Sequence, residues 1–462
     1  MVKNGKHITV LGLGKSGMAA VELALKKGYS VFAADSRSSD LLNEFRSRFR
    51  GNNNIQFSLG RVQIEIPDCS EIVISPGIRP DSDFGRLALA SGIPVVSELE
   101  FGLRFIDRPY LTVTGTNGKT TVTEMTVQIL RNYGMRAVGI GNIGVPVSET
   151  ALSEEKFDIA VVEASSFQLE YSENLHPAAA ALLNIHSDHI DWHKNFTNYS
   201  NAKLKMFKNI KKDNCAVINY NMKDSGLLQG VEPVTFSYES DEADIYYDSG
   251  TGGIYSSIFG KPLFCGALRN FSRHNIENIL AAAALASVVA EEKKLFRTAV
   301  QNCIENFTPS PHRQELVAVY NGIKFINDSK STNPLSLIAA LEACAGGDKS
   351  VCLIAGGLDK QMDFSDVLKY KNKIKVIFLI GDSKKSLVTL WNYDIHCILC
   401  DTFKDAVSGA ADFAESGDVV LLSPGCASMD MFENYQERGN VFRNLILNDI
   451  IGNKQMQMCS ES

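Results

Sequence analysis

Short apolar runs alternate with longer segments that mix apolar and polar residues along most of the chain. In the first part, the runs at 8–11, 29–34 and 71–75 predict strands, and the segment up to Lys27 predicts a helix. Strands that alternate with helices across short turns are typical of a parallel sheet covered on both faces. The pattern therefore predicts an α/β protein, in which ligands bind beyond the carboxyl ends of the strands.

The same alternation returns twice further along the chain. A strand at 109–113 and a helix at 122–130 open a second part, which also contains a buried strand at 157–163. In a third part, strands followed by small, polar or charged residues are predicted at 325–329, 351–355, 376–380 and 419–422. We therefore expect three α/β domains, over residues 1–107, 108–310 and 311–462.

Length and composition are those of a globular protein. A chain of 462 residues has room for roughly two to four domains, and 45% hydrophobic and 21% charged residues are ordinary proportions. A net charge of −7 argues against a nucleic-acid partner or an acidic membrane surface. The chain enters a strand almost at once, which predicts no signal peptide, and the apolar run at 279–290 is short enough to predict a buried helix. We interpret the ten cysteines as reduced thiols of a cytoplasmic enzyme.

A glycine-rich segment joins the strand at 109–113 to the helix that follows it. It reads Gly115-Thr116-Asn117-Gly118-Lys119-Thr120-Thr121. In such a loop, glycines let backbone N–H groups converge on phosphate oxygens, and the helix N-terminus adds partial positive charge. Lys119 would bring its charge to the outer phosphates, and the Thr120 hydroxyl could bind Mg²⁺. The loop is a shortened form, because Val113 stands where the general pattern has a further glycine.

A second glycine pattern follows the first predicted strand. Gly12, Gly14 and Gly17 are followed 18 residues later by Asp35, at the end of the second strand. This spacing matches the dinucleotide fingerprint and on its own would indicate NAD. Because the same kind of loop can hold any diphosphate, the identity of this nucleotide stays open.

Two further features suggest a divalent metal ion. Glu163 ends a buried strand, where phosphate-loop proteins place an acidic residue that binds Mg²⁺ directly or through water. The segment 184–193 holds three of the eight histidines, His186, His189 and His193. Their spacing could suggest zinc, but no fourth-ligand set accompanies them. We therefore expect one histidine to serve Mg²⁺ or Mn²⁺ and the others to pack or lie at the surface.

Taken in order, these motifs resemble those of the Mur ligases of peptidoglycan synthesis. The matching segments are 115–120, 163–170 (Glu-Ala-Ser-Ser-Phe-Gln-Leu-Glu), 188–189, 312–313, 327–333 (Asn-Asp-Ser-Lys-Ser-Thr-Asn) and 423–428 (Ser-Pro-Gly-Cys-Ala-Ser). The resemblance covers essentially the whole chain. It implies a Rossmann-like N-terminal domain for a UDP-sugar, a central phosphate-loop ATPase-like domain and a Rossmann-like C-terminal domain for an amino acid.

The segments 163–170 and 327–333 are most similar to those of the family member that adds D-glutamate to UDP-N-acetylmuramoyl-L-alanine. The resemblance implies ATP-dependent amide formation through an acyl phosphate, with Mg²⁺ or Mn²⁺ as the metal ion, in a cytoplasmic monomer. Such a reaction needs no covalent nucleophile. The protein must neutralise phosphate charge and align the attacking amine.

The resemblance also implies roles for individual residues. It implies that ATP is bound by Gly115–Thr121, Asn275, Asn278, Arg313 and Asp328, the UDP-sugar by Lys15, Ser16, Asp35, Ser36, Arg37, Gly77, Asn142 and His189, and D-glutamate by Thr332, Lys360 and Ser428. The expected catalytic residues are Lys119, Glu163, His189 and Lys203, and the expected metal ligands are Thr120, Glu163, His189 and Lys203. Lys203 would act as a carbamate, because a carbamate can ligate Mg²⁺ and an ammonium group cannot. Without the resemblance, Lys203 would be interpreted as one of several surface lysines.

Three other interpretations remain open. A nicotinamide-dependent dehydrogenase would explain the first glycine pattern and leave the phosphate loop and the third domain without a role. A sensor of nucleotides or UDP-sugars would need the loop, but not Lys203, Lys360 and His189 together. A folylpolyglutamate-type ligase of the same superfamily would be expected to carry substrate loops that differ from residues 165–168.

Overall fold

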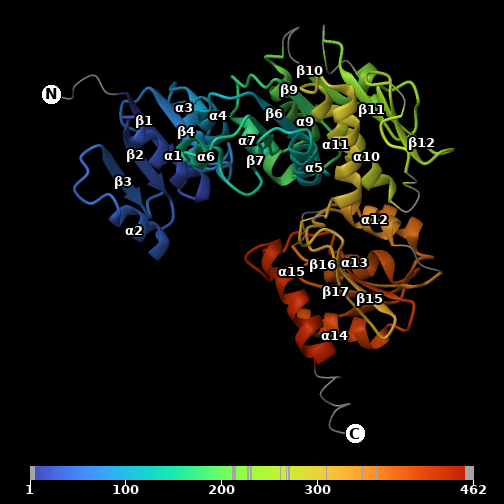
Figure 1. Ribbon diagram of the computed structural model, residues 1–462. Coiled ribbons are helices and arrows are strands. Elements are labelled where there is room, and N and C mark those ends of the chain that lie inside the picture. Colours follow the sequence, from blue (N-terminus) through green and yellow to red (C-terminus); the bar gives the residue numbers. More distant parts are fainter. Residues whose placement is uncertain are drawn as a thin grey trace. The chain divides into compact units, whose positions relative to one another are not determined.

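The structure is a computed structural model whose described residues form three β-sheets, one after another along the chain (Figure 1). It describes residues 6–210, 215–225, 228, 231–260, 262–266, 268, 271–308, 310–344, 348–358 and 362–452. The chain forms two compact units, Met1–Arg269 with Ile276–Phe307, and Asn270–Asn275 with Thr308–Ser462. The first unit holds the first two sheets and the second unit holds the third. The predicted α/β fold class is confirmed.

The first sheet is parallel throughout and has the strand order β3-β2-β1-β4-β5. Its strands are β1 (His7–Leu11), β2 (Ser30–Asp35), β3 (Ile55–Leu59), β4 (Glu71–Ile74) and β5 (Val95–Ser97), and its helices are α1 (Lys15–Lys26), α2 (Asp40–Ser47), α3 (Asp83–Ala90) and α4 (Glu98–Leu103). The runs are continuously apolar because both faces are buried: Val31 and Ala33 pack in one cluster, Phe32 and Ala34 in another. The loops after β1, β2 and β4 meet at one edge, where the strand order reverses.

The second sheet has the order β13-β12-β11-β10-β9-β6-β8-β7 and is parallel except for the pair β12–β13. Its strands are β6 (Tyr110–Thr114), β7 (Ala137–Gly141), β8 (Ile159–Glu163), β9 (Ala179–Leu182), β10 (Cys215–Asn219), β11 (Val234–Ser237), β12 (Ile245–Asp248) and β13 (Gly253–Ser256). The helices are α5 (Lys119–Asn132), α6 (Val147–Leu152), α7 (Ser166–Glu170), α8 (Ile190–His193), α9 (Phe196–Leu204), α10 (Arg273–Ser287) and α11 (Lys293–Asn306), with short helices η1 (Lys205–Phe207) and η2 (Tyr220–Ser225). The register sets Val113 of β6 beside Glu163 of β8. The strand ends that carry the predicted loop and the predicted metal ligand are therefore neighbours.

The third sheet has the order β14-β15-β19-β16-β17-β18, with β14 antiparallel and the others parallel. Its strands are β14 (Glu315–Tyr320), β15 (Ile323–Asn327), β16 (Val351–Gly356), β17 (Ile374–Ile380), β18 (Cys397–Leu399) and β19 (Val419–Leu422). The helices are α12 (Pro334–Ala343), α13 (Lys384–Trp391), α14 (Phe403–Phe413) and α15 (Tyr435–Asn444), with η4 (Ser365–Tyr370) and the π-helical η5 (Leu445–Gly452). Strands β14 and β18 have no counterpart among the predicted runs, since β14 is a half-buried edge strand and β18 has three residues. The loops after β15, β16 and β19 lie side by side at one edge of the sheet.

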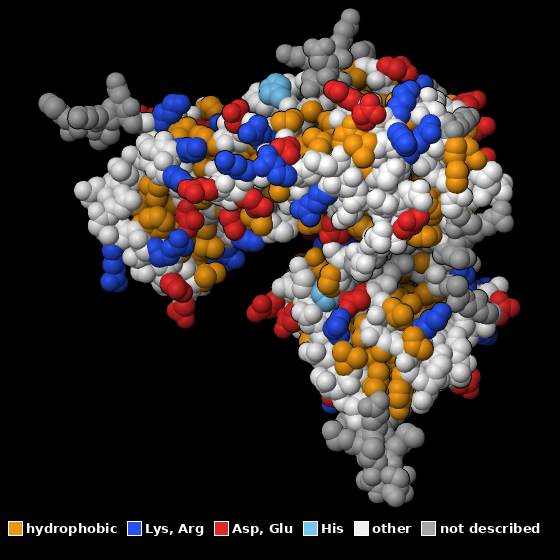
Figure 2. All heavy atoms as spheres, viewed as in Figure 1, with side chains coloured by type: hydrophobic (Ala, Val, Ile, Leu, Met, Phe, Trp, Pro, Cys, Tyr) orange, Lys and Arg blue, Asp and Glu red, His pale blue; other side chains and the backbone are white. Residues whose placement is uncertain are grey.

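The long apolar segment near residue 280 is a helix, as predicted. Within α10, Ile276 and all residues from Asn278 to Ser287 are buried. In the part of the chain that the structure describes, no helix is long and apolar enough to cross a membrane. On the face drawn in Figure 2, blue and red side chains are interspersed among the described residues, in keeping with an acidic protein that has charges of both signs.

Candidate active site

The phosphate loop lies between β6 and α5, at the carboxyl end of an inner strand of the second sheet. Gly118 is the N-cap of α5 and has a φ of +85°, in the left-handed region that favours glycine. A Cβ atom there would lie 2.4 Å from Asn278 Oδ1, so the turn also needs glycine for space. The Lys119 ammonium donates to the carbonyls of Gly115 and Thr116, at 2.9 Å each. The predicted loop is therefore a glycine-dependent turn at a helix N-terminus, with Asn278 against it.

Asn184, for which the sequence analysis predicts no role, fixes this loop from a neighbouring strand. Its Oδ1 accepts the N–H groups of Thr116 (3.1 Å) and Asn117 (2.9 Å), and its Nδ2 donates to the Asn117 carbonyl (3.2 Å). The Thr116 hydroxyl lies 2.9 Å from the Tyr199 hydroxyl. Asn184 reaches the loop because β9, which ends two residues before it, pairs with β6. In the sequence, only the position of an asparagine just beyond a strand could have indicated this role. The pairing of β9 with β6, which brings Asn184 to the loop, cannot be read from the sequence.

Glu163 lies buried at the end of β8 with one carboxylate oxygen unused. Its side chain is 2% exposed, and Oε1 accepts from Asn142 Nδ2 at 2.7 Å. The Asn142 backbone N–H also donates to the Glu163 carbonyl, at 2.8 Å. Among the described residues, Oε2 is buried and has no hydrogen-bond partner. A buried carboxylate oxygen is costly unless a cation or donor binds it, so this atom fits a metal ligand.

Lys203 is buried beside the phosphate loop, so the interpretation as a surface lysine is wrong. The side chain extends from α9, is 1% exposed, and donates to the Gly115 carbonyl at 2.8 Å. Its ammonium lies 4.7 Å from the centre of the Tyr199 ring. Burial, reinforced by the nearby charge of Lys119, lowers the pKa of Lys203 well below its ordinary value. Burial in this site therefore disfavours the protonated form of the Lys203 amine.

The three histidines of segment 184–193 have different surroundings. His189 is half-buried with a φ of +54°, and its Nε2 lies 3.7 Å from an Asp188 oxygen. His193 is buried, lies 3.0 Å from the Ser166 hydroxyl through Nε2, and stacks on Phe167. Burial lowers the pKa of His193 to about 4, so that it is a neutral packing residue at neutral pH. In the described ranges no group of three or more His, Cys, Asp and Glu is arranged to hold a metal ion.

In the first sheet, the predicted UDP-sugar residues lie at the edge formed by the loops after β1, β2 and β4. Asp35 is 3% exposed; its Oδ2 accepts the Leu13 N–H at 2.8 Å, and both oxygens accept from the Arg37 guanidinium. Burial alone would raise the pKa of Asp35, but the hydrogen bonds from Arg37 and Leu13 outweigh it and the pKa is lowered. Lys15 and Ser16 begin α1, and Lys15 donates to the Gly144 carbonyl at 2.8 Å. The remaining members, Ser36 and Gly77, lie in the loops that follow β2 and β4.

In the second unit, the loops after β15 and β19 are joined by buried polar contacts. Asp328 accepts the Ser423 hydroxyl at 2.9 Å and the Gln314 N–H at 3.1 Å, and burial raises its pKa to about 7. Ser428 is buried and Thr332 and Arg313 are half-buried. Lys360, also predicted for D-glutamate, lies outside the described residues.

Arg438, which the sequence analysis does not single out, fastens the same two loops. It extends from α15 and is 1% exposed. Its Nε donates to the Ser329 hydroxyl (3.0 Å), its Nη2 to the Ser329 carbonyl (2.8 Å), and both Nη atoms to the Cys426 carbonyl (3.1 Å each). Burial lowers its pKa to about 10, so it remains charged at neutral pH. Because Arg438 donates to acceptors on the loops after β15 and β19, it fixes the distance between these two loops.

The structure brings several of the predicted residues of the first unit together at the phosphate loop. Gly115–Thr121, Asn142, Glu163, Lys203 and Asn278 surround the phosphate loop, and His189 joins them through Tyr199, whose ring lies 6.3 Å away. Asn275 lies one turn earlier than Asn278 on the same helix and is half-buried, but it belongs to the second unit. Arg313, Asp328, Thr332 and Ser428 also belong to the second unit.

The one Cys-x-x-Cys pair of the sequence, Cys397 and Cys400, has two residues between its members, a spacing seen in redox motifs. The two side chains pack on opposite faces of the third sheet. Burial raises the pKa of each of these two thiols to about 11. The interpretation of these cysteines as reduced, inert thiols agrees with this placement.

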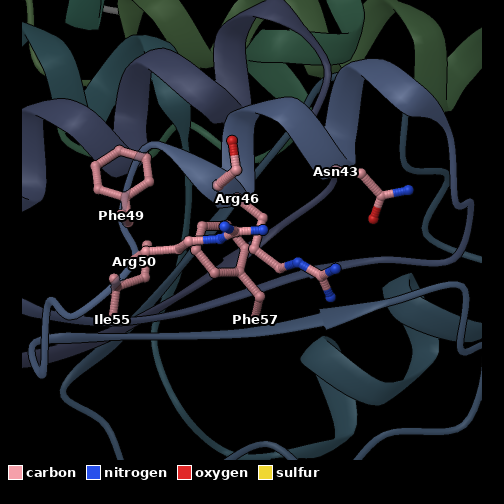
Figure 3. A pocket seen from close by; sticks show the side chains of 7 residues that line it. Asn43, Arg46, Phe49, Arg50, Ile55 and Phe57 are labelled. Atoms are coloured by element: carbon pink, nitrogen blue, oxygen red, sulfur yellow. The ribbon is translucent and has the colours of Figure 1, made fainter.

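A separate cavity of about 340 Å³ lies between α2 and β3, and Figure 3 shows the side chains that line it. They are Asn43, Arg46, Ser47, Phe49, Arg50, Ile55 and Phe57. No predicted nucleotide or substrate residue is among them. The cavity is therefore distinct from the site built around the phosphate loop.

A glycine-dependent loop at a helix N-terminus, with a buried carboxylate on the adjacent parallel strand, defines a nucleotide-binding protein of the phosphate-loop class. Residues 6–97 match the family described as Mur ligase MurD-like, N-terminal domain; residues 113–286 match Mur ligase middle domain; and residues 312–426 match Mur ligase, glutamate ligase domain. The chain belongs to the Mur ligase family.

Relatives of known name match over nearly the full length. A UDP-N-acetylmuramoylalanine–D-glutamate ligase of Thermoanaerobacter pseudethanolicus is 34% identical, covering 96% of this chain and 99% of the relative. One of Pelotomaculum thermopropionicum is 35% identical, covering 96% and 97%. Among solved structures, the fold is similar to that of UDP-N-acetylmuramate–alanine ligase of Thermotoga maritima, with a TM-score of 0.59, 18% identity, and coverage of 96% and 99%. It is also similar to MurF ligase of Thermotoga maritima in complex with ADP, with a TM-score of 0.56, 16% identity, and coverage of 96% of each chain.

Proposed function

We propose that this chain is an ATP-dependent ligase that joins D-glutamate to UDP-N-acetylmuramoyl-L-alanine, a cytoplasmic step of peptidoglycan precursor synthesis. The observation that carries the proposal is the placement of two buried side chains, Glu163 and Lys203, against one phosphate loop. The full-length relatives, which are ligases of this name, support it. The enzyme would act as a monomer on three small molecules, without a nucleic-acid or membrane partner.

The reaction has two steps. An oxygen of the substrate carboxylate forms a bond to the γ-phosphorus of ATP, the bond to ADP breaks, and an acyl phosphate results. The amine of D-glutamate then forms a C–N bond at the acyl carbon, phosphate leaves as the C–O bond breaks, and the nitrogen loses a proton that the leaving phosphate or water takes up. Lys119 and the N–H groups of residues 115–121 would bind the phosphates, where charge develops. Because protein groups supply electrostatics and alignment, no side chain needs to be covalently modified by substrate.

The residues around the loop fit a magnesium ion, with manganese as a substitute. The buried Oε2 of Glu163 has no hydrogen-bond partner among the described residues, and Thr120 is the second residue of α5, in the turn that follows the phosphate loop. When bound, the metal ion would neutralise charge on the phosphate oxygens. Thr120, Glu163, His189 and Lys203 are the proposed ligands.

Lys203 would serve as a carbamate. A neutral Nζ can attack carbon dioxide, so that an N–C bond forms and a proton leaves to water. One C–O π bond of carbon dioxide breaks in this step, so the product carries a single negative charge shared by two oxygens at the end of a long side chain, and these oxygens suit Mg²⁺. The lowered pKa of Lys203 supports this step, because the protonated amine has no free electron pair.

The substrates are assigned by domain. The proposed domains are 1–107 for the UDP-sugar, 108–310 for ATP and 311–462 for D-glutamate. The proposed UDP-binding residues are Lys15, Ser16, Asp35, Ser36, Arg37 and Gly77, with Asn142 and His189 at the sugar-peptide end of the substrate. ATP would be bound by the phosphate loop together with Asn275, Asn278, Arg313 and Asp328. D-glutamate would be bound by Thr332, Lys360 and Ser428. The two carboxylates of D-glutamate call for cationic and hydroxyl partners, which this last group supplies.

A phosphate-release assay tests the proposal directly. Release should require ATP, UDP-N-acetylmuramoyl-L-alanine and D-glutamate together. Equal turnover with L-glutamate, L-lysine or meso-diaminopimelate would remove the assignment within the family. A dehydrogenase would instead use Asp35 to receive the ribose hydroxyls of NAD. Titration of the full chain with UDP and with NAD separates these two interpretations.

A further inference from the structure

Helix α6 follows the loop that carries Asn142, and it depends on side chains from outside its own segment. It has six residues, and Pro146 at its N-cap makes no side-chain cap. A helix this short is not stable by itself, and its first N–H groups and last carbonyls need partners. The contacts at its two ends therefore decide whether this part of the chain is ordered.

The partner at the N-terminus is Glu98, from the helix that follows the first sheet. Glu98 opens α4 and is 1% exposed, and its Oε1 accepts the Ser148 N–H at 2.7 Å. A Cβ atom on Gly102 would lie 2.7 Å from the Ser148 nitrogen and 2.9 Å from the Val147 carbonyl carbon. The two helices approach this closely because residue 102 has no side chain. Glu98 thus supplies, from another helix, the cap that Pro146 cannot provide.

Two lysines of α1 hold the other end of the helix and the preceding loop. Lys26 donates to the Leu152 carbonyl, the last residue of α6, at 3.1 Å. Lys15 donates to the Gly144 carbonyl at 2.8 Å. The Glu98 oxygen accepts an N–H group at the N-terminus of α6, and the Lys26 cation at the C-terminus complements the helix dipole. All three side chains come from residues 1–107, the proposed UDP-sugar domain.

The segment so held leads directly to the proposed metal ligand. The Gly141 N–H donates to the Val145 carbonyl at 3.0 Å, which closes the turn between β7 and α6. Asn142, inside this turn, donates to Glu163 through its backbone (2.8 Å) and its side chain (2.7 Å). A displacement of α6 would therefore be transmitted through one short turn to the Glu163 carboxylate.

We propose that Glu98 and Lys26 are positioning residues for the ligase reaction: by capping α6 they hold Asn142 against Glu163 and couple the UDP-sugar domain to the phosphate loop. The inference rests on the proposed function of Glu163. Neither side chain touches a substrate. Their effect should appear in the order of α6 and, through Asn142, in turnover.

The test uses the full-length protein with Glu98→Ala, Glu98→Gln and Lys26→Met. The control is Glu149→Gln, which removes an exposed carboxylate from the first turn of the same helix. Hydrogen exchange of the Thr150 and Ser153 amides, which donate within α6, reports the order of the helix without any substrate. Steady-state phosphate release gives kcat and the KM of each substrate.

Loss of an N-cap commonly changes helix stability by about a factor of ten, so Glu98→Ala should speed exchange at these amides about tenfold. Its kcat/KM for the UDP-sugar should fall about tenfold. Glu98→Gln keeps an acceptor and should restore both quantities to within about threefold of wild type. Lys26→Met should shift both by about two- to fivefold.

Two results would overturn the proposal. One is unchanged exchange in α6 of Glu98→Ala and Lys26→Met. The other is faster exchange of the α6 amides together with phosphate-release kinetics equal to those of Glu149→Gln. In that case Glu98 and Lys26 would stabilise α6 without positioning the active site. If Glu98→Ala does not fold, Lys26→Met, which changes an exposed side chain, tests the proposal through hydrogen exchange in α6 and phosphate release. Absence of D-glutamate-dependent turnover in the wild type would refute the proposed function alone, because the exchange measurement does not depend on it.

Discussion

Replacing Arg438 by methionine should destabilise the second unit by about 3 kcal/mol. The change leaves the buried carbonyls of Ser329 and Cys426 without the donors that now satisfy them. Each unsatisfied buried group costs roughly 1 to 3 kcal/mol, and removal of a desolvated cation offsets part of the sum. Methionine fills most of the space, so little of the effect should come from a cavity.

Urea unfolding of the full chain measures this loss. The protein has two tryptophans, and Trp391 is buried in the second unit, so its fluorescence in a Trp192→Phe background follows that unit. With a slope of about 2 kcal/mol per molar urea, the midpoint should fall by about 1.5 M. The control is Arg443→Met on the same helix, whose exposed guanidinium pairs with Glu315 and should contribute less than about 1 kcal/mol.

A midpoint for Arg438→Met within about 0.5 M of that for Arg443→Met would refute the reasoning, because four hydrogen bonds from a buried cation would then contribute nothing measurable. Arg438→Lys separates charge from geometry. A lysine keeps the cation but cannot span both loops with a planar fork, so its stability should lie between those of the methionine variant and the wild type.

Three other outcomes are expected. Lys119→Ala should lower turnover about a hundredfold or more, with UDP-sugar binding by calorimetry unchanged; equal turnover would contradict the phosphate-loop assignment. Lys203→Ala should have low activity that formate or acetate partly restores in the presence of Mg²⁺, with no such rescue for Lys119→Ala; full activity without added acid would contradict the carbamate. Burial raises the pKa of Glu98 to about 7 from 4.5, so its contribution to stability is lost as pH rises through this interval. Glu98→Gln should therefore gain roughly 3 kcal/mol over wild type between pH 4 and pH 8 in unfolding experiments, and a parallel pH dependence of the two proteins would contradict this.

Local sequence patterns predicted nine of the nineteen strands of the described structure and the phosphate loop, because each of these depends on residues that are neighbours in the chain. The run 109–113 and the glycines after it are sufficient to predict the turn at Gly118, although Asn184 also holds this loop in the folded chain. The burial of Lys203 could not be predicted in this way. Its helix has a mixed composition, and the cause of its burial, the Gly115 carbonyl, lies 88 positions away.

The missed residues share this dependence on distant contacts. Asn184 acts on a loop 67 positions earlier, Glu98 caps a helix 50 positions later, and Arg438 binds the Ser329 loop across 109 positions. Each of these residues is ordinary in its local context. The order of the strands in the sheets decides which of these residues meet, and this order cannot be read from a single sequence.

The burial of the thiols determines where this protein can be labelled. Among the cysteines that the structure describes, Cys265 is exposed, whereas Cys303 and Cys352 are buried, with pKa values raised to about 12. Alkylation requires the thiolate and access to it, so a maleimide dye at neutral pH should react at Cys265 before it reacts at the buried Cys303 and Cys352. A fluorophore could thus be attached to the central domain of the natural sequence, and with a second dye placed on the C-terminal domain it would report the distance between them during turnover.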